Sequence, residues 1–308
     1  MDVVCFGELL IDFVADESGK SVGDVSKFVK APGGAPANVA VGIARLGHQS
    51  AFIGQVGADP FGQYLSGILE SENVNVEGLS FSPEARTALA FVSLADEGER
   101  SFVFYRHPSA DMLFKPEDVN LDIIESTKIF HFGSITLIHE PSKSATIAAL
   151  DHARKHNLLI SYDPNLRMAL WSDADSARRE MMTGFDYAHI VKISDEELEF
   201  LTGGTNVGPL WREPTKLIVV THGSGGATAH TRHARIHRPA PKANAIDTTG
   251  AGDAFVAGLL TGILENPTDY QNKLEQILHF ANTAGSLATT KKGAIPALPQ
   301  RQQVEAGG

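Results

Sequence analysis

The sequence predicts an α/β protein in which a central, mostly parallel β-sheet carries helices on both faces and a small β-sheet stands beside it. Short apolar runs alternate with helical patterns along most of the chain, and such alternation produces parallel strands joined by crossover helices. Two β-rich runs, at residues 87–94 and 100–105, interrupt this alternation as a hairpin does. The hairpin therefore predicts a second sheet outside the main one.

Six apolar runs are the candidates for strands of the main sheet. The first, residues 3–13, is interrupted by Gly7 and Glu8 and has Asp12 at its end. The others are residues 51–56, 128–132, 158–162, 189–193 and 217–221. Between these runs, apolar positions at helical spacing predict helices. The helices cover residues 39–46, 61–72, 141–156, 174–183, 195–201, 252–264 and 272–290.

The second sheet is expected to form a small lid. Its hairpin has acids and a glycine at residues 96–99, as a turn requires, and residues 14–32 form a loosely alternating, strand-like piece. We place the lid at approximately residues 14–32 and 85–112. Because no stretch has the composition of an interdomain linker, we expect residues 1–308 to form a single α/β domain with this lid.

Composition excludes several classes of function. The formal net charge is −11, and no basic stripe that could bind nucleic acid is present. No run of about 18 apolar residues is found, and the start of the chain carries an acid where a signal peptide would carry basic residues. The single cysteine, Cys5, fits a reducing compartment. We therefore expect a cytoplasmic protein that binds neither nucleic acid nor membrane.

Polar residues follow several of the predicted strands. They are Asp12 after the first strand, 163–167 after the fourth, Ser194 and Glu197 after the fifth, and 221–223 after the sixth. Each alone is more typical of a cap or a turn. Because ligands of parallel sheets bind beyond the carboxyl ends of the strands, the set predicts one polar cleft.

Residues 247–253, Asp-Thr-Thr-Gly-Ala-Gly-Asp, precede a long apolar helical run. Glycines allow close approach of the backbone, and a helix N-terminus presents N–H groups that attract anions. An acid beside such a site would repel an anion, so Asp253 suggests a base that accepts a proton during transfer to a phosphate. The alternative is a helix that Asp253 merely caps.

Other common nucleotide-binding, metal-binding and catalytic motifs do not occur in the sequence. Neither a P-loop nor a dinucleotide-binding glycine fingerprint occurs, because Phe255 stands where the third glycine would be. No His-Glu-x-x-His motif, Cys/His cluster or nucleophile elbow occurs. The irregular spacing of His230, His233 and His237 favours a solvated face over a metal site. The histidines therefore give no zinc motif.

Two stretches resemble the signatures of the ribokinase-like (PfkB) carbohydrate kinases: residues 33–40, Gly-Gly-Ala-Pro-Ala-Asn-Val-Ala, and residues 247–253. The resemblance covers essentially the whole chain, and within the family residues 104–111 and 192–198 look most like fructokinases. It implies a ribokinase-like fold with ATP-dependent phosphorylation of a sugar hydroxyl. Mg²⁺ would accompany the nucleotide, and K⁺ is used by many members.

The resemblance also implies roles for individual residues. Asp253 would be the general base, and the N–H groups of Gly250, Ala251, Gly252 and Asp253 would form the anion hole. The sugar would be held by Asp12, Gly33, Gly34 and Asn38, with Arg106 and Arg167 as clamps. Nucleotide and Mg²⁺ would be bound by Lys192, Ser194, Glu197, Thr221, Gly223, Gly226 and Asn282. The monovalent cation would lie among Asp247, Thr249, Ala288, Lys291, Gly293 and Ala297.

Some of these residues depart from the usual pattern of the family or have a second interpretation. Ser194 stands where many family members carry asparagine, and among the monovalent-cation residues only Asp247 supplies a carboxylate. Asn38 could also be a helix cap, and Arg106 a surface charge.

The substrate is expected to be fructose, phosphorylated at a terminal hydroxyl. The alternatives are a kinase of the same family acting on 2-keto-3-deoxygluconate, another sugar or a nucleoside, or a catalytically inactive sugar-binding regulator. Only a kinase requires the base at Asp253. Apolar residues on the lid strands also suggest a homodimer that forms through the lid.

Overall fold

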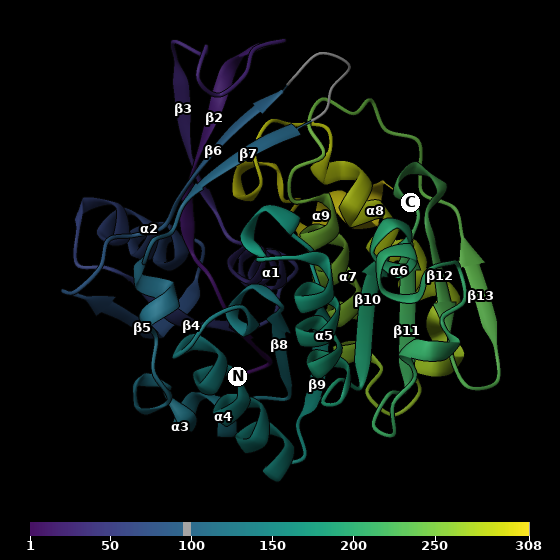
Figure 1. The fold of residues 1–308 in the computed structure, drawn as a ribbon. Helices are drawn as coiled ribbons and strands as arrows, with labels where there is room; N and C mark the ends of the chain where they lie inside the picture. The colour runs from purple at the N-terminus through teal and green to yellow at the C-terminus, as the bar shows by residue number, and fades with distance from the viewer. Residues whose placement is uncertain (95–99, 308) are drawn as a thin grey trace.

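The main sheet of the protein has nine strands, which run side by side across the computed structural model (Figure 1). The structure describes residues 1–94 and 100–307. From one edge to the other, the strands are β13 (Arg235–Arg238), β12 (Ala227–His230), β11 (Leu217–Thr221), β10 (Ile190–Ser194), β9 (Leu159–Asp163), β8 (Ile129–Gly133), β1 (Val3–Phe6), β4 (Ser50–Gly57) and β5 (Val74–Ser82). Neighbouring strands pair in parallel from β11 to β5, and β12 is antiparallel to both of its neighbours.

Helices cover both faces of this sheet because its strands are apolar on both sides. In β1, Val3 and Cys5 belong to one buried cluster and Val4 and Phe6 to the other, as alternation along a strand requires. The first cluster is completed by α1 (Ala35–Arg45), α2 (Pro60–Ser71), α7 (Ala251–Glu265), α8 (Leu274–Ala288) and α9 (Arg301–Ala306). The second is completed by α3 (Leu121–Glu125), α4 (Ser142–Lys155), α5 (Ala174–Phe185) and α6 (Asp195–Thr202).

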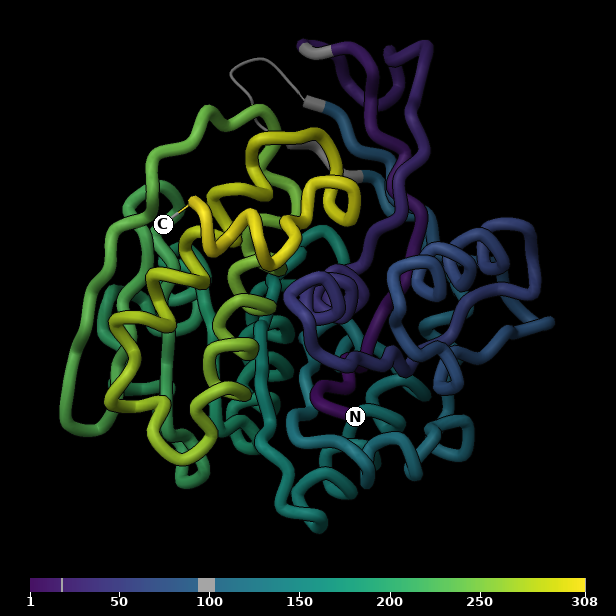
Figure 2. Tube along the Cα trace, turned by 180° about the vertical axis from the view of Figure 1, so that it is seen from behind, coloured from purple at the N-terminus to yellow at the C-terminus, as the bar shows by residue number. Residues whose placement is uncertain are grey.

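Helix α7 is the most buried helix of its face: every residue from Asp253 to Ile263 is buried. It lies between α1 and α8, and small residues allow both neighbours to approach closely (Figure 2). A Cβ on Gly42 of α1 would lie 2.6 Å from that of Ala257, and a Cβ on Gly258 would lie 2.8 Å from Ala281 of α8. Since real Cβ atoms do not approach so closely, these glycines set the position of α7 and of its N-terminus.

The second sheet has four strands and projects from the main body (Figure 1). Its order is β3 (Phe28–Gly33), β2 (Leu10–Ser18), β6 (Leu89–Leu94) and β7 (Arg100–Tyr105). We call these four strands the small sheet. The pairing register puts Ala31, Asp12, Ala90 and Phe104 in one row, so their side chains leave the same face of the sheet.

One strand prediction was wrong. Residues 3–13 do not form one strand that ends at Asp12: β1 lies in the main sheet, β2 lies in the small sheet, and Asp12 is inside β2. The chain changes sheets at Gly7, whose φ is 156° and where a Cβ would lie 2.5 Å from Pro36. Asp12 nevertheless reaches the cleft, from the small sheet.

Three strands were not predicted from the sequence. The strands β12 and β13 have four residues each, with histidine and arginine among them, and β5 contains Asn75, Glu77 and Gly78, which are uncommon in strands. The predicted helices agree with α1, α2 and α4–α8 to within a few residues at most ends, and the short α3 and α9 were missed. The predicted turn at residues 96–99 lies outside the described residues. Among the described residues, no helix has both the length and the apolar character needed to cross a membrane.

Candidate active site

A cleft of about 560 Å³ lies where the carboxyl ends of the central strands meet the small sheet and the N-termini of α1 and α7. The strand ends contribute Asp163, Ser194 and Thr221, and the small sheet contributes Asp12 and Phe104. Thirteen residues predicted for the site line this cleft: Asp12, Gly34, Asn38, Arg167, Lys192, Ser194, Glu197, Thr221, Gly223, Thr249, Gly250, Gly252 and Asp253. The convergence of polar strand ends is therefore present in the structure.

The first turn of α7 forms one wall of the cleft. Its N-cap, Gly250, has φ 78°, and a Cβ there would lie 3.0 Å from Ala294, so glycine is strongly favoured. The N–H groups of a first helical turn have no partner within the helix and carry partial positive charge. The Ala251 N–H donates to the Thr248 carbonyl at 3.3 Å, so it is already used inside the turn. Gly252 and Asp253 follow it in the wall.

Asp253 is held by a residue that lies 215 positions away in the sequence. The Asn38 side chain on α1 donates from Nδ2 to Oδ2 of Asp253 at 2.8 Å, and both residues are buried. The other amide atom, Asn38 Oδ1, is buried and has no hydrogen-bond partner among the described residues. Asn38 therefore orients the carboxylate and keeps an acceptor for a further donor in the cleft.

Burial raises the pKa of Asp253 above its ordinary value, because the charged form loses hydration. The Asn38 hydrogen bond and the positive charges of Lys192 and Arg167 oppose that rise without cancelling it. The carboxylate is consequently more basic than an exposed aspartate, which is the direction that a general base requires.

Lys192 supplies a buried positive charge to the cleft. Its Nζ donates to both carboxylate oxygens of Asp163, at 3.1 and 3.3 Å. Burial alone would lower the pKa of Lys192, but Asp163, Glu197 and Asp253 raise it above its ordinary value. Burial also raises the pKa of Asp163, to about 7, against the effect of Lys192. Because the ammonium group contacts both oxygens, we assign the pair as lysine cation and aspartate anion.

Lys192 also lies against α7. A Cβ on Gly252 would be 3.3 Å from Nζ of Lys192. The cation and the N-terminal end of α7 therefore lie together, and both favour negative charge at this point of the cleft.

Glu197 connects α6 to the neighbouring strand-end loop. Its Oε2 accepts from the Ser194 N–H at 2.8 Å, and its Oε1 accepts from the Leu166 N–H at 2.7 Å. In return the Ser194 hydroxyl accepts from the Glu197 N–H at 3.1 Å, which completes a capping box at the start of α6. Ser194 thus has a structural role in the cap of α6.

Two acids and two glycines lie close together where the small sheet meets the start of α1. A Cβ on Gly33 would lie 2.2 Å from Oδ2 of Asp12, and one on Gly34, with φ 112°, would lie 2.4 Å from the Glu8 carbonyl. Only glycines allow the acidic side chain and the backbone to lie this close. Gly33 itself does not line the cleft, but it makes room for Asp12.

Glu8 was not among the predicted site residues, although it lines the cleft. Its Oε1 accepts from the Ala35 N–H at the start of α1, at 3.0 Å. Burial raises the pKa of Glu8 to about 7. The sequence does contain a hint of this role, because Glu8 is an acid next to a glycine inside an apolar run. The ordinary interpretation of such a pair is a solvated turn.

Besides Gly33, four residues predicted to bind sugar or nucleotide or to act in catalysis do not line the cleft: Ala251, Arg106, Gly226 and Asn282. Arg106 is buried, not on the surface, and is paired with Asp111; it lines a separate cavity of about 250 Å³. Asn282 donates to the Arg238 carbonyl at 2.9 Å, and a Cβ on Gly226 would lie 2.2 Å from the same oxygen. Asn282 therefore supports the end of β13, and the missing side chain of Gly226 lets the backbone of β13 approach it closely.

The residues predicted for a monovalent cation lie in two loops that hydrogen-bond to each other. Oδ1 of Asp247 accepts from the N–H and hydroxyl of Thr249, at 2.9 and 2.6 Å, and Oδ2 accepts from the Gly293 N–H at 2.9 Å. Only Thr249 of this group lines the cleft; Ala288, Lys291 and Ala297 do not. Asp247 thus connects the segment that precedes α7 with the segment that follows α8.

Comparison with known proteins agrees with this geometry. The family model for pfkB family carbohydrate kinases matches residues 1–301. The chain belongs to this family. It is 52% identical to a protein named probable fructokinase-6, chloroplastic, from Arabidopsis thaliana, over 98% of this chain and 81% of that protein.

Two solved structures extend the similarity of this carbohydrate kinase to the whole fold. A fructokinase with bound ATP from Xylella fastidiosa is 33% identical, with a TM-score of 0.91 over 99% of this chain and 97% of that one. A double mutant of fructokinase from Vibrio cholerae, with fructose, ADP and potassium ion bound, is 37% identical, with a TM-score of 0.88 over 99% and 97%. The predicted family and the predicted ribokinase-like architecture are therefore confirmed.

Proposed function

We propose that the protein is a fructokinase, which transfers the γ-phosphate of ATP to a terminal hydroxyl of fructose. The observation that carries this proposal is the buried Asp253 carboxylate, which Asn38 orients at the first turn of α7 inside the cleft. A sugar-binding regulator would not need a base with a raised pKa at this point. The names of the relatives and the fructose in one related structure support fructose as the substrate.

In the proposed reaction, the sugar hydroxyl oxygen forms a bond to the γ-phosphorus while the bond from that phosphorus to the β-phosphate oxygen breaks. The hydroxyl proton passes to Asp253, and ADP leaves. Lys192 and the N–H groups of Gly252 and Asp253 would stabilise the charge on the transferring phosphoryl oxygens. Asn38 Oδ1 and Asp12 would accept hydrogen bonds from other sugar hydroxyls, since a polyol is rich in donors.

ATP and Mg²⁺ fit the residues present. The Lys192 cation beside the α7 N-terminus suits a triphosphate, and Gly223 and Thr221 line the same cleft. Each carboxylate oxygen of Glu197 accepts one backbone N–H, and a carboxylate has about four lone-pair sites. Glu197 would therefore hold Mg²⁺ through its coordinated water, and the ion would neutralise phosphate charge when bound.

A monovalent cation such as K⁺ would bind between the two loops that Asp247 connects. Asp247 contributes negative charge there, and the carbonyl oxygens around Thr249, Ala288, Lys291, Gly293 and Ala297 are suitable ligands for a hard cation. We expect K⁺ to raise turnover by ordering residues 247–250 before α7. Equal rates in K⁺ and in a large organic cation would argue against the site.

The test of the base is Asp253→Asn. This isosteric change keeps the Asn38 contact in reach but removes the proton acceptor, so turnover should fall by roughly 10²- to 10⁴-fold, the usual scale of general-base effects. The matched control is Asp122→Asn, an exposed acid on α3. Turnover of Asp253→Asn within tenfold of the unmodified protein would refute the role.

The test of the substrate is an ADP-release assay with ATP and Mg²⁺ over fructose, 2-keto-3-deoxygluconate, other sugars and nucleosides. We expect the highest kcat/KM for fructose. A higher value for another acceptor would assign the enzyme to that acceptor, and no ADP release with any acceptor would favour the inactive regulator.

The proposed compartment is the cytoplasm. The relative from Arabidopsis thaliana carries the word chloroplastic in its name, so a plastid is the competing location. Imaging of the full-length protein with a C-terminal fluorescent tag would distinguish the two.

A further inference from the structure

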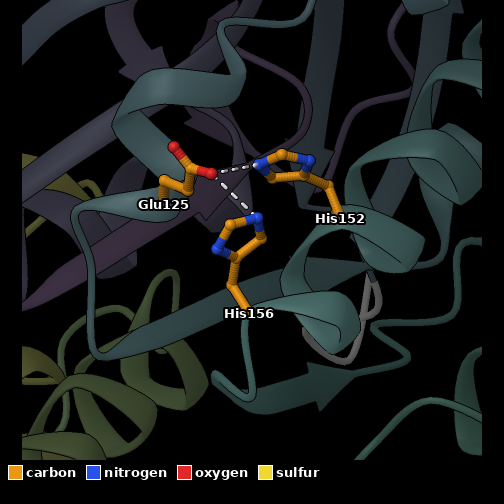
Figure 3. Close-up of side chains that lie close together, drawn as sticks. All are labelled: Glu125, His152 and His156. Atoms are coloured by element: carbon orange, nitrogen blue, oxygen red, sulfur yellow. Dashed lines mark ion pairs between the residues drawn. The ribbon is translucent and has the colours of Figure 1, made fainter.

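The side chains of two histidines and a glutamate, from two neighbouring helices, point toward one another (Figure 3). Glu125 is the last residue of α3, and His152 and His156 stand four positions apart at the C-terminal end of α4. After α3 the chain enters the amino end of β8, and after α4 it enters that of β9, whereas the cleft lies at the carboxyl ends. Within residues 1–94 and 100–307, no other three His, Cys, Asp or Glu residues have the spacing of a metal site.

The three side chains point their ligand atoms at a common position. Nε2 of His156 lies 2.8 Å and Nε2 of His152 lies 3.9 Å from the same glutamate oxygen, Oε1. All three atoms lie within 4.8 Å of one another. Tetrahedral ligands at about 2.0–2.1 Å from Zn²⁺ are about 3.4 Å apart, so small side-chain rotations bring these atoms to the required geometry.

An ion pair explains only part of this arrangement. A protonated His156 would account for the contact of 2.8 Å with Glu125. Nε2 of His152, however, is buried and has no hydrogen-bond partner among the described residues, and the two imidazole rings are only 4.5 Å apart. A buried ring nitrogen without a partner costs free energy, and two adjacent imidazolium ions would repel each other. A bound cation satisfies both nitrogens with neutral rings.

We propose that Glu125, His152 and His156 form a site for Zn²⁺, with the fourth position occupied by water. Imidazole nitrogens with one carboxylate are a ligand set that suits Zn²⁺, whereas Mg²⁺ and Ca²⁺ prefer oxygen ligands alone. The C-terminal end of α4 also favours positive charge. Because the site joins α3 to α4 far from Asp253, its role is to stabilise the fold. The zinc motifs considered in the sequence do not include the His-x-x-x-His spacing at residues 152–156.

The test starts from full-length protein that has been treated with a chelator and dialysed. Titration calorimetry with Zn²⁺ should give one site per chain, and Co²⁺ should produce the intense visible absorption of a tetrahedral complex. His152→Ala and His156→Ala should each lower the Zn²⁺ affinity at least roughly 10- to 100-fold, since loss of an outer-shell partner alone costs that much. Zn²⁺ should raise the Tm of the unmodified protein more than that of either variant at the same concentration of metal.

His233→Ala, an exposed histidine in the turn between β12 and β13, is the matched control and should keep the affinity. Glu125→Gln removes the carboxylate from an exposed side chain, so it keeps the test valid if a histidine variant folds poorly. Kinase turnover of Glu125→Gln should stay at the level of the unmodified protein. The proposal is overturned if Zn²⁺ binds the double variant His152→Ala/His156→Ala as tightly as the unmodified protein, or if Co²⁺ gives no such absorption.

Discussion

At the scale of single residues, the cleft is distinguished by ionisable groups that are nearly excluded from water. Asp253, Asp163, Lys192, Glu197 and Glu8 are each 8% exposed or less. Such burial costs free energy unless every charge has a partner, and most of these groups have one: Asp163 has Lys192, and Glu197 has two N–H donors. Buried ionisable groups that cost free energy in this way are typical of active sites, where they bind or transfer charge.

Glu8 gives a prediction about the pH dependence of stability. Its pKa is raised by burial from 4.5 to about 7, so between these values the folded state holds a proton that the unfolded state has lost. The contribution of Glu8 to the free energy of unfolding is therefore fully present below pH 4.5 and is lost as the pH rises toward 7. Glu8→Gln should lack this loss, and its stability relative to the unmodified protein should rise by up to about 3 kcal/mol across the window.

Urea unfolding at pH 4.5 and at pH 7 measures the difference in the free energy of unfolding between Glu8→Gln and the unmodified protein. Glu84→Gln, an exposed loop residue, is the control and should show no such change. A difference between the Glu8 variant and the unmodified protein that does not vary with pH would contradict a raised pKa at Glu8.

At the scale of elements, one acid connects a helix of the main body to the small sheet. Asp59 caps α2 by accepting from the N–H groups of Phe61 and Gly62, at 3.0 and 2.9 Å. It also accepts from the N–H and the hydroxyl of Thr87, each at 2.8 Å, just before β6. Burial alone would raise its pKa, but these hydrogen bonds lower it below the ordinary value. Asp59 thus stabilises the fold above its ordinary pKa, and the contribution is lost as the pH falls.

Asp59→Ala should reduce the free energy of unfolding by about 2–4 kcal/mol, because it removes a helix cap and leaves the Thr87 donors buried without a partner. Asp173→Ala removes a cap of α5 that is exposed and accepts only within its own segment, so it should cost about 1 kcal/mol. Denaturant midpoints at neutral pH compare the two. Equal losses in both variants would mean that Asp59 acts only as a cap.

At the scale of the whole molecule, the small sheet exposes apolar side chains. Val29, on the face of the sheet that carries Asp12, is 51% exposed, and Val103 and Tyr105, on the opposite face, are 40% and 62% exposed. On a sheet that projects from the body, such side chains suit contact with a second copy of the chain (Figure 1). The homodimer through the small sheet stays a prediction.

Light scattering at micromolar concentration should therefore give twice the chain mass of 33.0 kDa. Val29→Glu should shift the mass toward one chain, because burying a charge in an apolar contact is costly. Leu121→Glu, which changes a side chain of similar exposure on α3, should not. If the unmodified protein has the mass of a single chain, the predicted homodimer is wrong.

Local pattern in the sequence determined most of the elements and the edge of the sheet at which the cleft lies. Alternation of apolar runs with helical spacing is a property of neighbouring residues, and strand ends converge wherever strands are parallel. The glycine motifs also indicated which loops approach a ligand. The predicted strand at 3–13 was wrong because a change of sheet at Gly7 depends on the position of Pro36, which no local pattern encodes.

Only the tertiary structure decided which side chains meet. Asn38 contacts Asp253 because α1 packs on α7 through Gly42 and Ala257, and Lys192 contacts Asp163 because β9 and β10 pair in parallel. The burial that raises the pKa of Glu8 and Asp253, and the meeting of α3 with α4 at Glu125, arise in the same way. Contact and burial depend on how separate elements pack in space, whereas a sequence pattern reports only on residues that are near one another along the chain.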